Sequence, residues 1–175
     1  VFDGVKGNYT ELCKPNAKDD YGISKLKSER IVKKNSLVIR TSIIGHEKNQ
    51  SKKSLLNWFL SQKKNCIGFK KAYFSGVTTL ELSNVILHLI KKKKFESGLF
   101  NLSGKKITKF TLLKLIKKKY KKNIEIHPDF LFKIDRSLIG KKFNKKFKIK
   151  INSWVVQIDQ MHKNYKSTKK LYNYL

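Results

Sequence analysis

Segments with the pattern of helices alternate along this chain with segments that have the pattern of buried strands. Short apolar runs between polar or turn-forming residues predict strands, and apolar residues at three- and four-residue steps predict one-sided helices. The run at residues 37–39 has the first pattern, and the stripe of Leu82, Val85, Ile86 and Leu89 has the second. This alternation predicts an α/β fold.

The expected elements can be placed along most of the chain. They are, in order, a helix over 19–34, a short strand over 37–39 followed by the segment 41–45, a helix over 51–62, a strand over 66–69, a loop over 72–76, a helix that starts after Thr78 and is closed by residues 91–94, a strand over 99–102, a helix from 109 to about 120, a strand over 124–126 and a helix from 153. Thr78 and Glu81 have the spacing of a capping box, in which each side chain satisfies a free backbone N–H at the helix start. Thr108 is expected to cap the next helix, and the last strand is expected to end before Pro128.

The formal net charge of the chain is +29, which raises the hypothesis of a nucleic-acid partner. However, 38 of the 41 basic residues are lysine and only three are arginine. Arginine is the side chain suited to bidentate recognition of phosphate and guanine. The charge is also spread along the chain in many short clusters. We therefore interpret the lysines as solvated surface, and nucleic acid is not an expected partner.

Several other classes of protein are not supported by the sequence. No apolar run approaches the roughly 18 residues that a membrane span needs, so no membrane association is expected. Cys13 and Cys66 are far apart and lack a CxxC partner, and the histidines have no metal-binding spacing, so no metal is expected. A reduced, cytoplasmic setting is the default. Ser24 and Ser42 lack a paired His and Asp, which leaves a hydrolase without support.

One motif carries chemistry. Tyr21 and Lys25 form a Tyr-x-x-x-Lys pair near the start of a predicted helix, and four residues are one helical turn, so both side chains are expected on the same face. A free tyrosine is a poor acid or base at neutral pH, but a lysine cation one turn away favours its ionised form. Such a pair can exchange a proton with a substrate oxygen while a hydride moves to or from a nicotinamide.

The segments around this pair resemble a known family. They are Val1-Phe2-Asp3-Gly4, Tyr9-Thr10-Glu11, Lys14-Pro15-Asn16, Tyr21-Gly22-Ile23-Ser24-Lys25-Leu26, Val38-Ile39-Arg40-Thr41-Ser42, Phe74-Ser75-Gly76-Val77-Thr78, Gly98-Leu99-Phe100-Asn101-Leu102-Ser103-Gly104 and Asp135-Arg136-Ser137-Leu138. In this order they are similar to the dTDP-4-dehydrorhamnose reductases, which are sugar-nucleotide enzymes of the extended short-chain dehydrogenase type. The resemblance extends over nearly the whole chain.

The resemblance implies how the chain is organised. The expected fold is the trailing part of a doubly wound, Rossmann-like NAD(P)-binding domain plus a small mixed α/β substrate-binding lobe. Residues 1–65 would be the C-terminal part of the cofactor-binding domain, with the Tyr-x-x-x-Lys helix. Residues 66–175 would be mainly the substrate-binding lobe, with elements that return to the cofactor domain. The glycine-rich turn that seats the cofactor pyrophosphate would belong to a missing N-terminal half of the same chain.

The resemblance also implies roles for single residues. The whole enzyme would reduce a nucleotide-linked 4-keto sugar with NADPH or NADH, and this fragment alone is expected to be inactive. Tyr21 would give a proton to the 4-keto oxygen, and Lys25 would hold the nicotinamide ribose and favour the ionised form of Tyr21. Ser42, which ends the Arg-Thr-Ser string, and Ile43, which follows it, are expected to line the sugar pocket.

Three alternatives stay open at this stage. A sugar-nucleotide epimerase or dehydratase can use the same scaffold. A non-catalytic member of the family can serve as a regulatory subunit, although the presence of both Tyr21 and Lys25 favours the enzyme. A cationic nucleic-acid-binding domain is disfavoured by the scarcity of arginine. The expected partners are the nucleotide-sugar substrate and the missing half of the chain, and a homodimer is left open.

Overall fold

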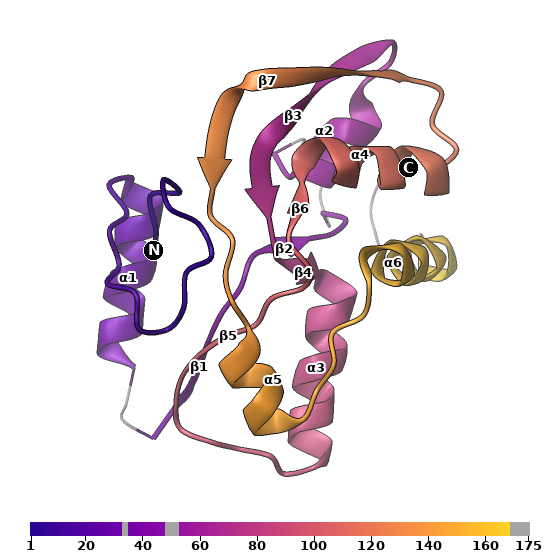
Figure 1. Ribbon diagram of the computed structural model, residues 1–175. Coiled ribbons are helices and arrows are strands. Elements are labelled where there is room, and N and C mark those ends of the chain that lie inside the picture. Colours follow the sequence, from indigo (N-terminus) through magenta and orange to yellow (C-terminus); the bar gives the residue numbers. More distant parts are fainter. Residues whose placement is uncertain (33–34, 48–52, 169–175) are drawn as a thin grey trace.

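The computed structural model describes residues 1–32, 35–47 and 53–168. Helices and strands alternate as the sequence predicts, and the fold is mixed α/β (Figure 1). The elements are, in order, α1 (Asp20–Ile31), β1 (Leu37–Arg40), β2 (Ile43–Ile44), α2 (Leu55–Ser61), β3 (Asn65–Phe74), β4 (Val77–Thr78), α3 (Thr79–Lys91), β5 (Gly98–Asn101), β6 (Ile107–Thr108), α4 (Lys109–Lys119), β7 (Glu125–Asp135), α5 (Lys141–Phe147) and α6 (Trp154–Thr168).

Among the described residues, the strands form three small sheets. β1 pairs with β5, and β2 pairs with β4, both in parallel. The third sheet has the order β6-β3-β7, in which β3 runs parallel to β7 and antiparallel to β6. β1 and β5 lie in the lower half of Figure 1 with α3 and α5, whereas β3 and β7 lie in the upper half with α2 and α4.

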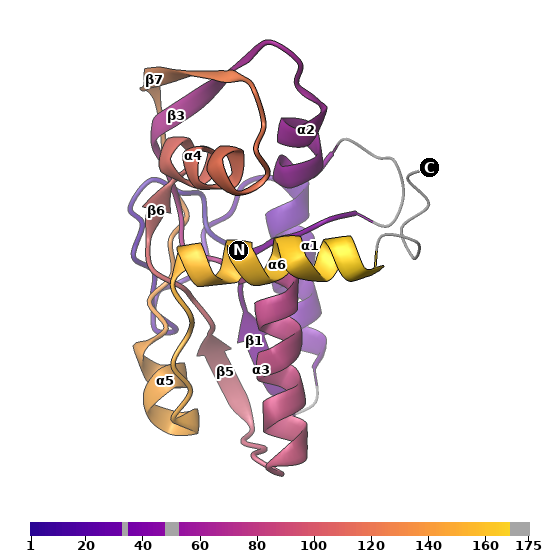
Figure 2. The same cartoon turned by 90° about the vertical axis from the view of Figure 1, so that its right-hand side faces the viewer.

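Each half has its own hydrophobic core. The lower core is built from α3, α5, β4 and β5 together with a neighbouring loop residue, and its buried residues are Val77, Val85, Leu89, Phe100, Leu102, Phe143 and Phe147. The upper core contains Leu56 and Phe59 from α2 and Leu112 and Ile116 from α4. Helix α6 adds Trp154 to the upper core and also packs against α3. Figure 2 shows α6 lying between the upper elements and α3, so this helix connects the two halves.

Several helix boundaries follow from caps near the predicted positions. Asp19 caps α1 rather than lying within it, and the helix ends at Ile31; residues 33–34 of the predicted helix lie outside the described part. Helix α2 begins at Leu55 because Ser54 accepts a hydrogen bond from the Asn57 N–H. The predicted start of that helix at 51–52 also lies outside the described residues. Thr108 caps α4, as predicted, by accepting from the Thr111 N–H.

Two strand predictions are wrong. The residues 72–74, expected in a loop, are the end of β3, because this strand pairs with β7 as far as Tyr73 and with β6 at Tyr73 and Phe74. The strand expected to end before Pro128 continues to Asp135. Pro128 is tolerated because β7 lies at the edge of its sheet, where a residue without an N–H need not lose a hydrogen bond.

The prediction of a capping box at the start of α3 is confirmed for Thr78 but wrong for Glu81. Thr78 does accept a hydrogen bond from the Glu81 N–H. The Glu81 carboxylate, however, does not return to the start of its own helix. It accepts hydrogen bonds from the backbone N–H and the side-chain amide of Asn152, at 2.9 and 3.0 Å. Glu81 therefore ties α3 to the segment just before α6, a contact between residues that are 71 positions apart.

None of the helices in the described part of the chain is both long and apolar enough to cross a membrane.

Candidate functional site

The Tyr-x-x-x-Lys pair lies on the first turns of α1. Asp19 precedes the helix and accepts a hydrogen bond of 2.7 Å from the Gly22 N–H, which fixes the first turn. Gly22 lies so close to Ala17 that a Cβ at this position would be 2.4 Å from the Ala17 Cβ. The side chain of Tyr21 is 71% exposed, and the Lys25 Nζ lies 5.4 Å from the centre of its ring. The two side chains thus share one face, as the spacing predicts.

All four predicted site residues line one hollow. This hollow has a volume of about 630 Å³, and Tyr21, Lys25, Ser42 and Ile43 are among its lining residues. It lies between α1 and β1, and residues from β2, α3 and the segment after β7 complete it. The structure therefore brings together residues that are up to 22 positions apart in the sequence. The chemical roles predicted for them stay predictions.

Two strands hold Ser42 and Ile43 at the hollow. The carbonyl of Ser42 accepts a hydrogen bond from the Val77 N–H at 2.9 Å, and Ile43 pairs with Val77 in the β2–β4 sheet. Gly76 makes this close approach feasible, because a Cβ at residue 76 would lie only 2.0 Å from the Ser42 carbonyl oxygen. The side chains of Ser42 and Ile43 remain exposed, so they are accessible to a ligand in the hollow.

Two arginines that the site prediction did not include also line the hollow. Arg40, at the end of β1, forms a bidentate salt bridge with Glu29 of α1. Its Nε and Nη2 atoms lie 2.8 and 2.7 Å from the two carboxylate oxygens. Arg136, just after β7, pairs with Asp19 at 2.9 Å. The hydrogen bond from Gly22 and the pair with Arg136 hold the pKa of Asp19 below its usual value. The ion pairs thus fix both ends of the helix that carries Tyr21. The sequence could have indicated these two arginines as site residues, because arginine is rare in this chain.

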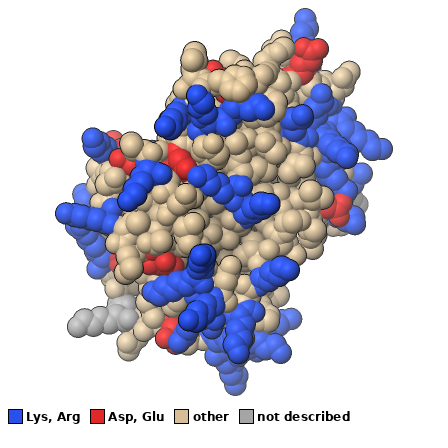
Figure 3. All heavy atoms as spheres, in the orientation of Figure 1, with Lys and Arg blue, Asp and Glu red and all other residues tan. Residues whose placement is uncertain are grey.

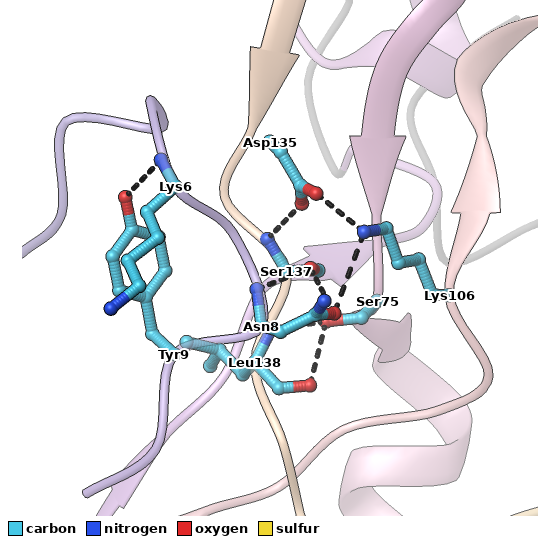
Figure 4. Close-up of polar contacts among 8 residues, drawn as sticks. All are labelled: Lys6, Asn8, Tyr9, Ser75, Lys106, Asp135, Ser137 and Leu138. Carbon is cyan, nitrogen blue, oxygen red and sulfur yellow. Dashed lines mark hydrogen bonds and ion pairs between the residues drawn. The ribbon is translucent and has the colours of Figure 1, made fainter. Parts of the chain in front are cut away.

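A polar cluster beside the hollow joins the first residues of the chain to the end of β7 (Figure 4). The Asn8 N–H donates to the Ser137 hydroxyl at 2.9 Å, and the Tyr9 N–H donates to the Ser137 carbonyl at 2.8 Å. The Leu138 N–H donates to the Ser75 hydroxyl at 2.7 Å, which connects the same segment to the turn after β3. These bonds fix Leu138, another residue of the hollow, relative to the segment that leads into α1.

The carboxylate of Asp135 lies at the centre of this cluster. It pairs with the Lys106 ammonium at 2.5 Å and accepts a hydrogen bond of 3.0 Å from the Ser137 N–H. Burial acts to raise the pKa of Asp135, but the hydrogen bonds from Lys106 and Ser137 outweigh it, so the pKa lies below its usual value. A Cβ at Gly7 would lie 2.1 Å from the Asp135 carboxylate, and Gly7 has a φ of +71°. Glycine is therefore required for this packing.

The mixed α/β fold that carries this hollow is of the Rossmann-like class found in solved reductases and epimerases. The chain belongs to the family described as RmlD substrate binding domain, which matches residues 1–167. No curated protein sequence matches it.

Solved structures with the same fold include enzymes of this class. A hypothetical dTDP-4-dehydrorhamnose reductase from Sulfolobus tokodaii is 28% identical with a TM-score of 0.70, over 86% of this chain and 56% of that one. The dTDP-4-dehydrorhamnose reductase from Bacillus anthracis in complex with NADP is 17% identical with a TM-score of 0.80, over 94% and 62%. UDP-N-acetylglucosamine 4-epimerase from Bacillus cereus is 18% identical with a TM-score of 0.75, over 95% and 63%. The chain thus spans less than two thirds of each.

Proposed function

We propose that this chain is part of a longer enzyme that reduces the 4-keto group of a nucleotide-linked sugar with NADPH or NADH. The observation that carries the proposal is the convergence of Tyr21, Lys25, Ser42 and Ile43 on one hollow of about 630 Å³. The family match supports the class of enzyme, and the solved reductases of the same fold support the type of reaction.

Tyr21 is suited to act as the proton donor. Its side chain is exposed to the hollow, and its hydroxyl makes no hydrogen bond within the described part of the chain, so it is free to meet a substrate oxygen. In the proposed step the phenolic O–H bond breaks, a new O–H bond forms on the sugar oxygen, and a phenolate remains. The Lys25 ammonium stabilises this negative charge. Solvent then returns a proton to Tyr21.

The residues of the hollow fit the nicotinamide end of the cofactor. The dinucleotides NADP, NAD and NADPH are present in solved structures with this fold. Lys25 is exposed and can donate to ribose hydroxyls, and Val38 and Ile39 offer an apolar wall beside it. When bound, the nicotinamide supplies the hydride. The rest of the enzyme would supply the seat for the pyrophosphate.

We also propose the division of the chain that the sequence suggests. Residues 1–65 would complete the cofactor-binding domain, and residues 66–175 would form mainly the substrate-binding lobe. The lower core, which contains Val85 of α3 and Phe143 of α5, would be made of elements that return to the cofactor domain. The upper core would belong to the substrate-binding lobe. Association of the enzyme as a homodimer stays a prediction.

Replacement of Tyr21 tests the proposal. In the full-length enzyme, Tyr21→Phe should lower the turnover of a dTDP-4-keto-6-deoxy sugar by about 100- to 10,000-fold, the usual contribution of a positioned general acid. Cofactor affinity should change little. Lys25→Met should lower both turnover and cofactor affinity. Tyr73→Phe is the matched control, because Tyr73 does not line the hollow and its variant should keep full activity.

The assay follows oxidation of the reduced cofactor by its absorbance. A fully active Tyr21→Phe enzyme would exclude Tyr21 as the proton donor. An epimerase or dehydratase is the second candidate, because an epimerase and a dehydratase share the fold. Such an enzyme would convert its nucleotide sugar without net consumption of the reduced cofactor, whereas a regulatory subunit would show no turnover with either assay.

A further inference from the structure

A second hollow lies on the other side of the segment that follows β7. It has a volume of about 310 Å³ and shares only Leu138 with the hollow that contains Tyr21. Lys106 and Asn8, at its edge, can be seen in Figure 4. Three stretches of chain form most of its wall, namely residues 103–106, 138–144 and 150–151.

Two glycines let these stretches approach each other. A Cβ at Gly140 would lie 2.8 Å from the Ser103 hydroxyl, and a Cβ at Gly104 would lie 2.8 Å from the Gly76 carbonyl oxygen. The backbone of residues 103–104 is therefore held against residue 140 and the end of β3. Lys105 is held as well, because its carbonyl accepts a hydrogen bond of 2.6 Å from the Trp154 indole. The backbone along one side of the hollow is thus held in place by the fold.

The charge of this hollow differs from that of the first one. In the first hollow, the cations of Arg40 and Arg136 are both neutralised by acids that line the same hollow. The second hollow is lined by four lysines, and no acidic residue is among its lining residues. Lys106 is paired with Asp135 from outside the lining, but Lys105, Lys141 and Lys150 make no ion pair within the described residues.

Neutral hydrogen-bond donors accompany these cations. The Ser103 hydroxyl and the Asn144 amide line the same hollow, and neither has a hydrogen-bond partner in the described part of the chain. Like charges that face one concave surface repel each other and raise the local concentration of anions. Ammonium groups together with hydroxyl and amide donors are the chemistry that binds phosphate oxygens.

We propose that this second hollow binds a small phosphate-bearing anion, such as pyrophosphate or the diphosphate of a nucleotide. The site uses neither Tyr21 nor Lys25, so it does not depend on the proposed catalytic function. The volume of the hollow exceeds that of a single phosphate. Its lysines come from separate stretches of chain, which suits an anion with more than one phosphate group. Because Leu138 lines both hollows, an anion bound in the second hollow would contact the segment after β7 that also lines the first.

The main competing explanation is non-specific binding, because lysines are abundant over the surface. Figure 3 shows basic side chains over much of one face, with several crowded near the end of the molecule that holds α5. A matched pair of double variants separates the two explanations. Lys141→Gln with Lys150→Gln removes two cations from the hollow. Lys63→Gln with Lys64→Gln removes two exposed cations from the loop between α2 and β3, which lines neither hollow.

The experiment is a calorimetric titration of the full-length protein with inorganic pyrophosphate, at physiological salt and with the cofactor at saturation. We expect one saturable site whose affinity falls at least about tenfold in the hollow variant, equal to about 1.4 kcal/mol, and less than twofold in the control variant. Amide signals of Gly104 and Gly140 in a glycine-labelled sample should shift on binding. Tyr21→Phe should leave the titration unchanged, even if the proposed catalytic function proves wrong.

Titration with dTDP and with thymidine identifies the source of the phosphate. Tighter binding of dTDP than of pyrophosphate indicates a nucleotide site at this hollow only where the double variant of Lys141 and Lys150 loses it, because dTDP is also part of the proposed substrate. Equal binding of the two anions indicates a site for the inorganic anion. The proposal is overturned if pyrophosphate does not bind, or if both double variants lose affinity equally. It is also overturned if pyrophosphate shifts the amide signals of other glycines but leaves those of Gly104 and Gly140 unchanged.

Discussion

The two ion pairs of α1 show why arginine stands where it does in a chain that otherwise uses lysine. Arg40 meets both carboxylate oxygens of Glu29, a geometry that the planar guanidinium allows and an ammonium does not. The side chains of this pair are only 7% and 17% exposed. The pair of Arg136 with Asp19 is much more open, at 48% and 42%. The two ends of α1 should therefore respond differently to the loss of a charge.

Removal of the acid from each pair tests this difference. Glu29→Gln leaves the buried Arg40 without its counter-charge and should lower the free energy of unfolding by about 3 kcal/mol or more. Asp19→Asn keeps an acceptor for the helix cap and loses only an exposed pair, so it should cost less than about 1 kcal/mol. Urea denaturation of the full-length protein measures both. Equal decreases in the free energy of unfolding would mean that the buried pair stabilises the protein no more than the exposed pair.

A half-buried histidine makes stability depend on pH. The His46 ring stacks on Tyr165 at 3.7 Å and its Nε2 lies 2.8 Å from the Tyr120 hydroxyl. Burial, and to a smaller degree the nearby His162, lowers the pKa of His46 from 6.5 to about 4. Between these values the unfolded chain takes up a proton that the folded protein resists, so stability falls as the pH drops from 6.5 towards 4.

The urea midpoint should accordingly be lower at pH 5 than at pH 7.5. His46→Gln should be less stable at pH 7.5 but should show a weaker dependence on pH over this range. His127→Gln is the control, because the His127 ring is 58% exposed, and it should keep the dependence of the unmodified protein. An unchanged dependence in His46→Gln would show that other groups titrate instead.

Among the helices, α3 and α6 are joined by polar side chains rather than by apolar packing alone. Glu81 of α3, which is 4% exposed, accepts two hydrogen bonds from Asn152. Gln157 of α6 accepts from the Thr78 N–H at 2.9 Å and donates to the Asn152 carbonyl at 2.8 Å. Together they fix how α6 crosses the start of α3, and α6 connects the two cores.

Glu81→Ala should therefore weaken the connection between the halves. The loss of two hydrogen bonds to a buried charge should lower the free energy of unfolding by about 2–3 kcal/mol. Glu96→Ala, which breaks the exposed pair with Lys146, should cost less than about 1 kcal/mol. Thermal melting compares the two variants. A Glu81→Ala protein as stable as Glu96→Ala would show that apolar packing of α6 is sufficient.

Local signals were enough to predict the helix that carries Tyr21 and Lys25, and the caps at Thr78 and Thr108. A cap and a helical turn depend on residues three or four positions apart, which the sequence displays directly. The partner of Glu81 lies 71 positions away, and the partner of Asp19 lies 117 positions away. No local pattern specifies such pairs. The continuation of β7 through Pro128 depends likewise on its edge position, which is a property of the sheet.

The site was predicted for a different reason. The spacing of Tyr21 and Lys25 is local, but the position of Ser42 and Ile43 beside them came from the resemblance to a family and not from the residues themselves. The second hollow had no such guide, because its lysines are separated by up to 45 positions and lie among many others. Only the fold shows that Lys105, Lys141 and Lys150 face one space without an acid.

Our proposal that this chain is part of a longer enzyme predicts that the chain alone is poorly stable. Within the described residues β1 is paired on one side only, with β5, and the first hollow opens along α1 and β1. On our proposal, strands of the cofactor-binding domain pair with β1 and cover this region in the complete enzyme. Each large apolar side chain left uncovered forgoes about 1.5–3 kcal/mol, and the net stability of a domain is only about 5–15 kcal/mol.

Ile31, at 84% exposure, and Val32, at 42%, are two such side chains at the end of α1. Expressed alone, the 175-residue chain should therefore aggregate or melt over a broad range, and NADPH should not raise its melting temperature. The full-length enzyme should melt sharply, and NADPH should raise its melting temperature because a ligand that binds only the folded state stabilises it. Differential scanning calorimetry of both proteins, with and without NADPH, measures the width and the midpoint of each transition. A sharp, NADPH-dependent transition of the chain alone would mean that it holds a complete cofactor site.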